Sequence, residues 1–77
     1  MGIFSKTKKD KSAMWIKTAI ELQKLGKYHE AVRACEYARA ERPDNSDAWS
    51  LEVDILEKLG RHDEAERVRE QAKKLMK

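Results

Sequence analysis

The sequence contains one cysteine, one proline and no long apolar run. A single cysteine, Cys35, excludes an internal disulfide, which is typical of proteins that stay in a reducing compartment. No apolar stretch approaches the ~18 residues that a membrane-spanning helix needs. The first residues also lack the apolar core of a secretory signal peptide. We therefore expect a cytoplasmic protein without a transmembrane segment.

The net charge of the 77-residue chain is concentrated at its start. The formal net charge is +3, and residues 1–11 contain four lysines against one aspartate. Basic and acidic side chains balance over residues 12–77, so this part lacks the positive field that non-specific nucleic-acid binding requires. We expect no nucleic-acid partner. We interpret residues 1–11 as a flexible basic arm, which either is simply solvated or docks at an anionic membrane surface.

The chain after this arm consists of two copies of one pattern. Aligning residues 12–43 with residues 46–77 without a gap gives 11 identities in 32 positions. Trp15 recurs as Trp49 at the offset of 34 residues. A fixed period of this length indicates a stacked array of structural repeats.

Apolar residues at helical spacing predict four helices, at residues 12–25, 28–41, 46–59 and 62–76. Gly26 and Gly60 follow the first and third helices as residues able to take positive φ. Pro43 ends the second helix, because the residue before proline is disfavoured in helical conformation. Ser12 is the predicted N-cap of the first helix. The short connections require consecutive helices to be antiparallel.

Each predicted helix has one apolar face that we expect to be buried. On these faces, apolar residues recur every three or four positions. The faces consist of Trp15, Ala19, Leu22 and Leu25; of Ala31, Ala34, Cys35 and Ala38; of Trp49, Val53, Leu56 and Leu59; and of Ala65, Val68, Ala72, Leu75 and Met76. The small residues of the second helix predict a close approach between helices.

The pattern resembles the tetratricopeptide repeat, a helix–turn–helix unit of 34 residues with the signature W-x₂-L-G-x₂-Y, A-x₃-F and P. Residues at the family's positions are Trp15, Ala19, Leu25, Gly26, Tyr28, Ala31, Ala38 and Pro43, and then Trp49, Leu59, Gly60, Ala65 and Ala72. The resemblance implies an all-α solenoid of two stacked repeats, at residues 12–45 and 46–77. It also implies a protein-interaction module without catalytic activity or a cofactor.

Two departures from the family pattern concern the end of the array. The aromatic residue expected in the second helix of each repeat is replaced by Cys35 and by Arg69. Because Arg69 suits water at the last interface, we interpret the last helix as self-capping. Two repeats are fewer than the three usually needed for stability, so we expect exposed apolar surface around Val68, Leu75 and Met76. The formation of a homodimer through this surface is therefore an open alternative.

No residue pattern predicts a catalytic or metal site. Cys35 lacks a base at helical spacing, because His29 lies six residues earlier and points to another helix face. His29 and His62 are not spaced as zinc ligands and have no clustered cysteines. We expect no enzyme, no metal and no cofactor.

The resemblance assigns a concave partner-binding groove to the first helix of each repeat. The assigned residues are Ala13, Ile16, Ile20, Gln23, Lys24, Asp47, Ser50, Asp54, Glu57 and Lys58. Helical spacing independently places them off the apolar faces. Because isoleucines stand beside an acidic strip, we hypothesise a protein or peptide ligand with an apolar anchor and adjacent basic residues. Two alternatives stay open: the isoleucines pack the repeats together, or the chain is a structural unit that self-assembles.

Overall fold

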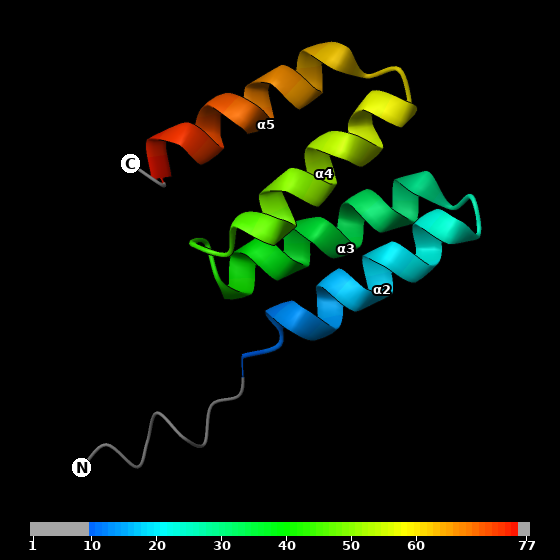
Figure 1. Ribbon diagram of the computed structural model, residues 1–77, viewed down its shortest axis with the longest axis horizontal. Helices are drawn as coiled ribbons and strands as arrows, with labels where there is room; N and C mark the ends of the chain where they lie inside the picture. The colour runs from blue at the N-terminus through cyan, green and yellow to red at the C-terminus, as the bar shows by residue number, and fades with distance from the viewer. Residues whose placement is uncertain (1–9, 76–77) are drawn as a thin grey trace.

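The computed structural model describes residues 10–75, which form four α-helices joined by short turns (Figure 1). The helices are α2 (Ser12–Lys24), α3 (Tyr28–Glu41), α4 (Ser46–Lys58) and α5 (His62–Leu75). They confirm the all-α prediction, and each predicted helix end lies within one residue of the observed end. The predicted arm, apart from its last two residues, and Met76 lie outside the described residues.

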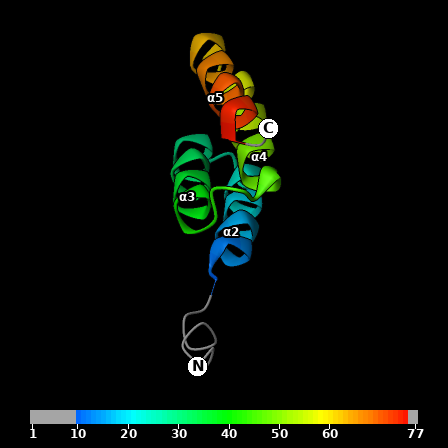
Figure 2. The ribbon, with the colours of Figure 1, turned by 90° about the vertical axis from the view of Figure 1, so that its left-hand side faces the viewer.

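The four helices form two antiparallel hairpins, and α4 is the element that joins them. Among the described helices, α4 contacts α2, α3 and α5, whereas α5 contacts α4 alone. Figure 2 shows α2 and α4 on one side of the molecule and α3 and α5 on the other. This arrangement puts the first helix of both hairpins on a shared face.

Glycine ends α2 and α4 in the same way. Gly26 has φ +81° and Gly60 has φ +79°, a conformation that other residues rarely adopt. The next residue in each case, Lys27 or Arg61, donates its backbone N–H over 2.9 Å to the carbonyl five residues earlier. These bonds form the C-terminal motif in which a left-handed residue satisfies the last carbonyls of a helix. Both predicted helix terminators are confirmed.

The predicted N-cap at Ser12 is wrong. Ser12 is the first helical residue, and its backbone N–H donates to Asp10 Oδ1 over 2.9 Å. Its buried hydroxyl accepts a hydrogen bond from Asn45 Nδ2 over 3.2 Å, which links the start of α2 to the residue before α4. Asn45 also caps α4, because its Oδ1 accepts from the Asp47 N–H over 3.1 Å. Asp10 pairs with Arg42 Nη1 over 2.8 Å, so the last residues of the predicted arm contact the end of α3.

Small side chains dominate the core between the hairpins. The buried residues Ala19, Ala31, Ala34, Cys35 and Ile55 form one cluster. The predicted close approach is confirmed at the four small residues of α3, including Ala38, which are at most 3% exposed. Ile55 of α4 is fully buried and was missed by the sequence analysis. A second cluster joins α4 to α5 and consists of Trp49, Leu56, Ala65 and Val68.

The predicted buried faces are wrong at several edge positions. Leu25 is 69% exposed because it lies in the turn after α2, and Leu75 is 56% exposed near the end of α5. Val68 is buried, which confirms its predicted place on the buried face of the last helix and contradicts its expected place in an exposed patch. Trp15 is half-buried and stacks on Tyr37, with their ring centroids 4.7 Å apart. The remaining half-buried members of the predicted faces are Leu22, Val53, Leu59 and Ala72.

Candidate functional site

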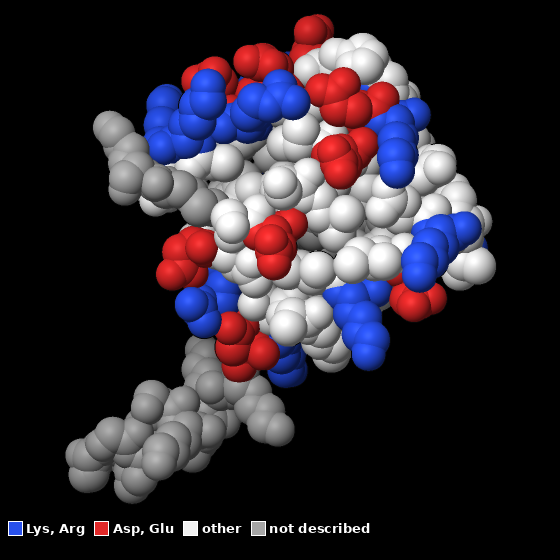
Figure 3. Space-filling model, viewed as in Figure 1, with Lys and Arg blue, Asp and Glu red and all other residues white. Residues whose placement is uncertain are grey.

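The ten residues of the predicted groove all lie on α2 and α4. Figure 3 views the molecule from the side of these two helices and shows a broad area of uncharged side chains, interrupted by acidic ones. The basic side chains lie mostly toward the rim of this view. Seven of the ten are exposed, namely Ala13, Ile20, Lys24, Asp47, Ser50, Asp54 and Lys58, and three are half-buried, namely Ile16, Gln23 and Glu57.

The two isoleucines of α2 leave apolar surface open on this side. Ile20 is 38% exposed and Ile16 is half-buried. Neither belongs to the two core clusters of the described residues. The alternative in which both isoleucines serve to pack the repeats together is therefore not supported by these clusters.

Three of the predicted binding residues are engaged inside the molecule. Lys58 Nζ donates to Gln23 Oε1 over 2.7 Å, a bond that ties α4 to α2. Glu57 lies 2.8 Å from His62 Nδ1 and 3.4 Å from Arg69 Nη2. The hydrogen bond to His62 lowers the pKa of the Glu57 carboxyl. We infer that these side chains hold the helices in place before they contact any ligand.

A buried ion pair joins α3 to α4, and the sequence analysis missed it. Arg39 Nε donates to Glu52 Oε1 over 2.7 Å, and the Glu52 side chain is 2% exposed. Burial raises the pKa of Glu52, while the hydrogen bond from Arg39 lowers it. The Arg39 guanidinium also lies over the Trp49 ring, 4.5 Å from its centroid. The available signal was a glutamate at the position where the family has leucine.

Trp49 is held by two contacts, the Arg39 guanidinium over its ring and a hydrogen bond from its ring nitrogen. Its Nε1–H donates to the Pro43 carbonyl over 2.7 Å, so the polar atom of the ring is satisfied next to the turn between the repeats. The proline that ends the first repeat therefore also orients the first large residue of the second. This bond and the ion pair fix the register of α4 against α3.

The predicted groove residues do not surround one common hollow. Ser50 and Asp54 line a hollow of about 580 Å³ between α4 and α5. We call this feature the end hollow; its other lining residues include Val53, Arg69, Ala72 and Lys73. Another hollow of about 580 Å³ lies between α3 and α5 and is lined by residues including Ala40, Gln71 and Leu75. Ile16 and Ile20 line neither hollow.

The described residues offer no assembled reactive centre. Burial raises the pKa of the Cys35 thiol to about 12, so the thiol stays protonated and is a poor nucleophile. Within residues 10–75, no group of three or more His, Cys, Asp or Glu side chains is placed to hold a metal ion. None of the described helices is both long enough and apolar enough to cross a membrane.

Comparison with known families gives one match. A family model described as tetratricopeptide repeat matches residues 22–76, which includes the end of α2 and all of α3, α4 and α5. Curated proteins and solved structures gave no match to the chain.

Proposed function

Because the chain belongs to the tetratricopeptide repeat family, we propose that it binds a protein partner across the shared face of α2 and α4. Repeats of this family generally mediate protein–protein interaction and are typically non-catalytic. The proposed ligand is an extended peptide segment with an apolar anchor followed by basic residues. We also propose that the chain has no reaction of its own.

The exposed Ile20 carries this proposal. It presents apolar surface one helical turn from the half-buried Ile16, on a helix that contacts α4. Asp47 and Asp54 supply exposed carboxylates from α4, and neither makes an ion pair with another described residue. An apolar contact on α2 beside negative charge on α4 suits a ligand that combines an apolar side chain with lysine or arginine.

Binding at this face is expected to be weak. The ten residues assigned to this face are fewer than the roughly 20–30 residues per side of a standard stable interface. Gln23, Lys58 and Glu57 are already engaged with other side chains of the molecule, which reduces the number of groups that can contact a ligand. Affinity is then concentrated in a few contacts, which makes single substitutions informative.

The apolar contact is tested by Ile20→Lys. The ¹⁵N-labelled chain is titrated with a set of short peptides, each with one leucine, isoleucine or phenylalanine followed by two arginines. The best peptide should shift the amides of Ile16 and Ile20, and Ile20→Lys should weaken its binding roughly fivefold or more, from ~1 kcal/mol of lost apolar burial. Leu25→Lys is the control, since Leu25 is an exposed apolar residue in the turn after α2 and is not one of the ten groove residues.

The charge contact is tested separately by Asp54→Asn. This change should weaken the same peptide and reduce the salt dependence of its binding. Asp63→Asn, an exposed position at the start of α5, should leave both unchanged. If neither Ile20→Lys nor Asp54→Asn changes the affinity for the peptide, the ligand lies elsewhere on the molecule.

Self-assembly is the second function that we propose to test. Leu75 is 56% exposed, and apolar surface left open at an array end favours association between copies. Sedimentation equilibrium over a concentration series decides between a dimer and a monomer, and Leu75→Lys should dissociate a dimer that uses this surface. Docking through the basic arm stays a prediction, because residues 1–9 lie outside the described part of the chain.

A further inference from the structure

The end hollow is a second copy of a surface that is partly covered in the first repeat. Shifted back by 34 residues, its lining corresponds to Ser12, Trp15, Ile16, Ala19, Ile20, Cys35, Ala38 and Arg39. Four of these, Ser12, Ala19, Cys35 and Ala38, are at most 2% exposed, whereas the other four are half-buried or exposed. The covering element is α4, since Ile55 belongs to the same core cluster as Ala19 and Cys35. The packing of α4 on the first repeat therefore shows how a helix can contact a surface equivalent to the end hollow.

The counterparts in the second repeat are more open, because no described helix lies over them. Ser46 is exposed, and Val53, Arg69 and Ala72 are half-buried. The end hollow of about 580 Å³ corresponds, by the repeat offset, to the place that α4 takes on the first repeat. Its lining keeps apolar or small residues at Val53 and Ala72, as a helix contact requires.

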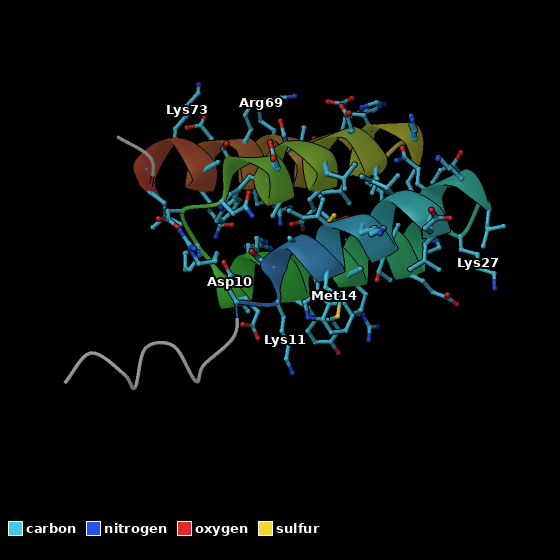
Figure 4. The ribbon with its side chains drawn as sticks, turned by 60° about the horizontal axis from the view of Figure 1, so that its bottom comes forward. Asp10, Lys11, Met14, Lys27, Arg69 and Lys73 are labelled. Carbon is cyan, nitrogen blue, oxygen red and sulfur yellow. The ribbon has the colours of Figure 1, made fainter. Side chains whose placement is uncertain are left out.

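Charge indicates what kind of helix fits the end hollow. On the first repeat, Arg39 pairs with Glu52 of the seated helix over 2.7 Å. Lys73 stands at the position of Arg39 in the second repeat; it is 69% exposed, and its one ion pair, with Glu70, is 3.8 Å long. Figure 4 shows Arg69 and Lys73 along the same side of α5. A helix that docks here meets Arg69 and Lys73 on the α5 side of the hollow and Asp54 on the α4 side, so it needs a carboxylate where it faces Lys73.

We propose that the end hollow docks an amphipathic helix of a partner protein that resembles α4 in its contact pattern. This helix has a glutamate facing Lys73, with one apolar residue directly before it and another three residues after it, as Leu51 and Ile55 flank Glu52. An asparagine seven residues before the glutamate donates to the Ser46 hydroxyl, as Asn45 donates to Ser12. This surface shares Ser50 and Asp54 with the predicted groove but does not include the isoleucines of α2.

A second copy of the chain fits the end hollow less well than such a partner. In head-to-tail stacking, α2 of the next copy would take the place of α4. It would then present Lys17 where α4 has Leu51, and Glu21 where α4 has Ile55. Two charged side chains would lie on the apolar part of the hollow, which is unfavourable. Thr18 would stand at the position of Glu52, so the carboxylate would be missing.

The test uses the chain's own α4 sequence as the probe. A synthetic peptide of residues 45–59, acetylated and amidated, is titrated into the ¹⁵N-labelled 77-residue chain. Amide shifts are expected at Val53, Ala72 and Lys73. Lys73→Glu should weaken the peptide about three- to tenfold by replacing an attraction with a repulsion. A peptide with lysine in place of Glu52 should restore binding to that variant.

Lys74→Glu is the matched control for this experiment. Lys74 is the neighbouring exposed lysine on α5, but it lines the hollow on the α3 side rather than the end hollow. The control variant should bind the original peptide as the unchanged chain does. Equal effects of Lys73→Glu and Lys74→Glu would overturn the proposal, because they would mean that general charge attraction holds the peptide.

Three other outcomes overturn the proposal in different ways. Shifts centred on Ile16 and Ile20 would mean that the peptide uses the face of α2 and α4. Shifts across α2 and α3 would mean that the peptide displaces the chain's own α4. Sedimentation that shows a dimer dissociated by Lys73→Glu would make a second copy the occupant. The absence of shifts at Val53 and Ala72 at millimolar peptide would exclude docking of an α4-like helix.

Discussion

Removing Arg39 should strongly destabilise the fold, because it leaves Glu52 buried without its partner. Removing one member of a fully buried ion pair costs about 3–5 kcal/mol. The Glu52 side chain is 2% exposed but that of Arg39 is 24% exposed, so some water reaches the pair. We therefore expect Arg39→Met to lower the free energy of unfolding at pH 7 by about 2–3 kcal/mol. This is a large part of the roughly 4–12 kcal/mol expected for a chain of this length.

The destabilisation should depend on pH in one direction. Burial raises the pKa of Glu52, and loss of the Arg39 guanidinium removes the contact that lowers it. The folded variant then binds a proton more readily than the unfolded chain does. Its stability falls as pH rises from the ordinary glutamate pKa, near ~4.3, to the raised folded value, and the full cost is present above that value. The difference between variant and unchanged chain should shrink toward pH 4.

Urea unfolding followed by far-ultraviolet circular dichroism measures this effect without relying on the fluorescence of Trp49, which lies under Arg39. The double variant Glu52→Leu, Arg39→Met should recover most of the loss, since an apolar pair replaces two charges. Arg33→Met is the control, because Arg33 is an exposed arginine of the same helix. A loss below about 0.5 kcal/mol for Arg39→Met, the range of ordinary surface changes, would refute the reasoning. So would a loss that stays constant between pH 7 and pH 4.

Three further predictions follow from the same structure, on the two glycines, on Cys35 and on Asn45. Gly26→Ala and Gly60→Ala should each reduce the stability by about 1 kcal/mol, because both positions have positive φ; thermal unfolding measures this, and a neutral result would contradict the turn geometry. Cys35 should not react with a disulfide reagent at pH 8 until urea unfolds the chain, because burial raises its pKa to about 12; fast labelling of the native protein would show that the thiol is accessible. Asn45→Ala should cost about 1–2 kcal/mol, because it removes both the cap of α4 and the bond to Ser12; Asn45→Asp, which keeps the cap acceptor, should recover part of this in urea unfolding.

The helix boundaries could be predicted from the sequence because they are set by local residues. Gly26, Gly60 and Pro43 act on the backbone next to them, and their effect does not depend on the rest of the fold. The close packing around Ala31 and Cys35 was also predictable, since small residues at helical spacing permit close approach wherever the partner helix comes from.

Burial at the edges could not be predicted, because it depends on which neighbour is present. Leu22 and Leu56 occupy equivalent positions, yet Leu22 is half-buried while Leu56 is 2% exposed. Ala19 and Val53 differ in the opposite direction, since α4 covers the first and no described helix covers the second. A periodic sequence predicts the same burial for equivalent residues of both copies. In a finite array the two copies have different neighbours, so the burial of equivalent residues differs.

The partner-binding role of the ten predicted groove residues stays a prediction, and the sequence could not show their contacts. All ten lie on α2 and α4. Helical spacing could not show that Lys58 bonds Gln23 or that Glu57 is held by His62, because these contacts join different helices. The pairing of Glu52 with Arg39 needs a third helix, α3, and was missed for the same reason.

The attachment of α5 to α4 alone has a consequence for how the molecule opens. Among the described helices, each of α2, α3 and α4 contacts at least two others, whereas α5 contacts one. Only Ala65 and Val68 of α5 are buried. Local opening is easiest where few buried contacts hold an element, so α5 should detach before the rest unfolds. Its amides should exchange with solvent deuterium fastest among the four helices, and those of α4 slowest.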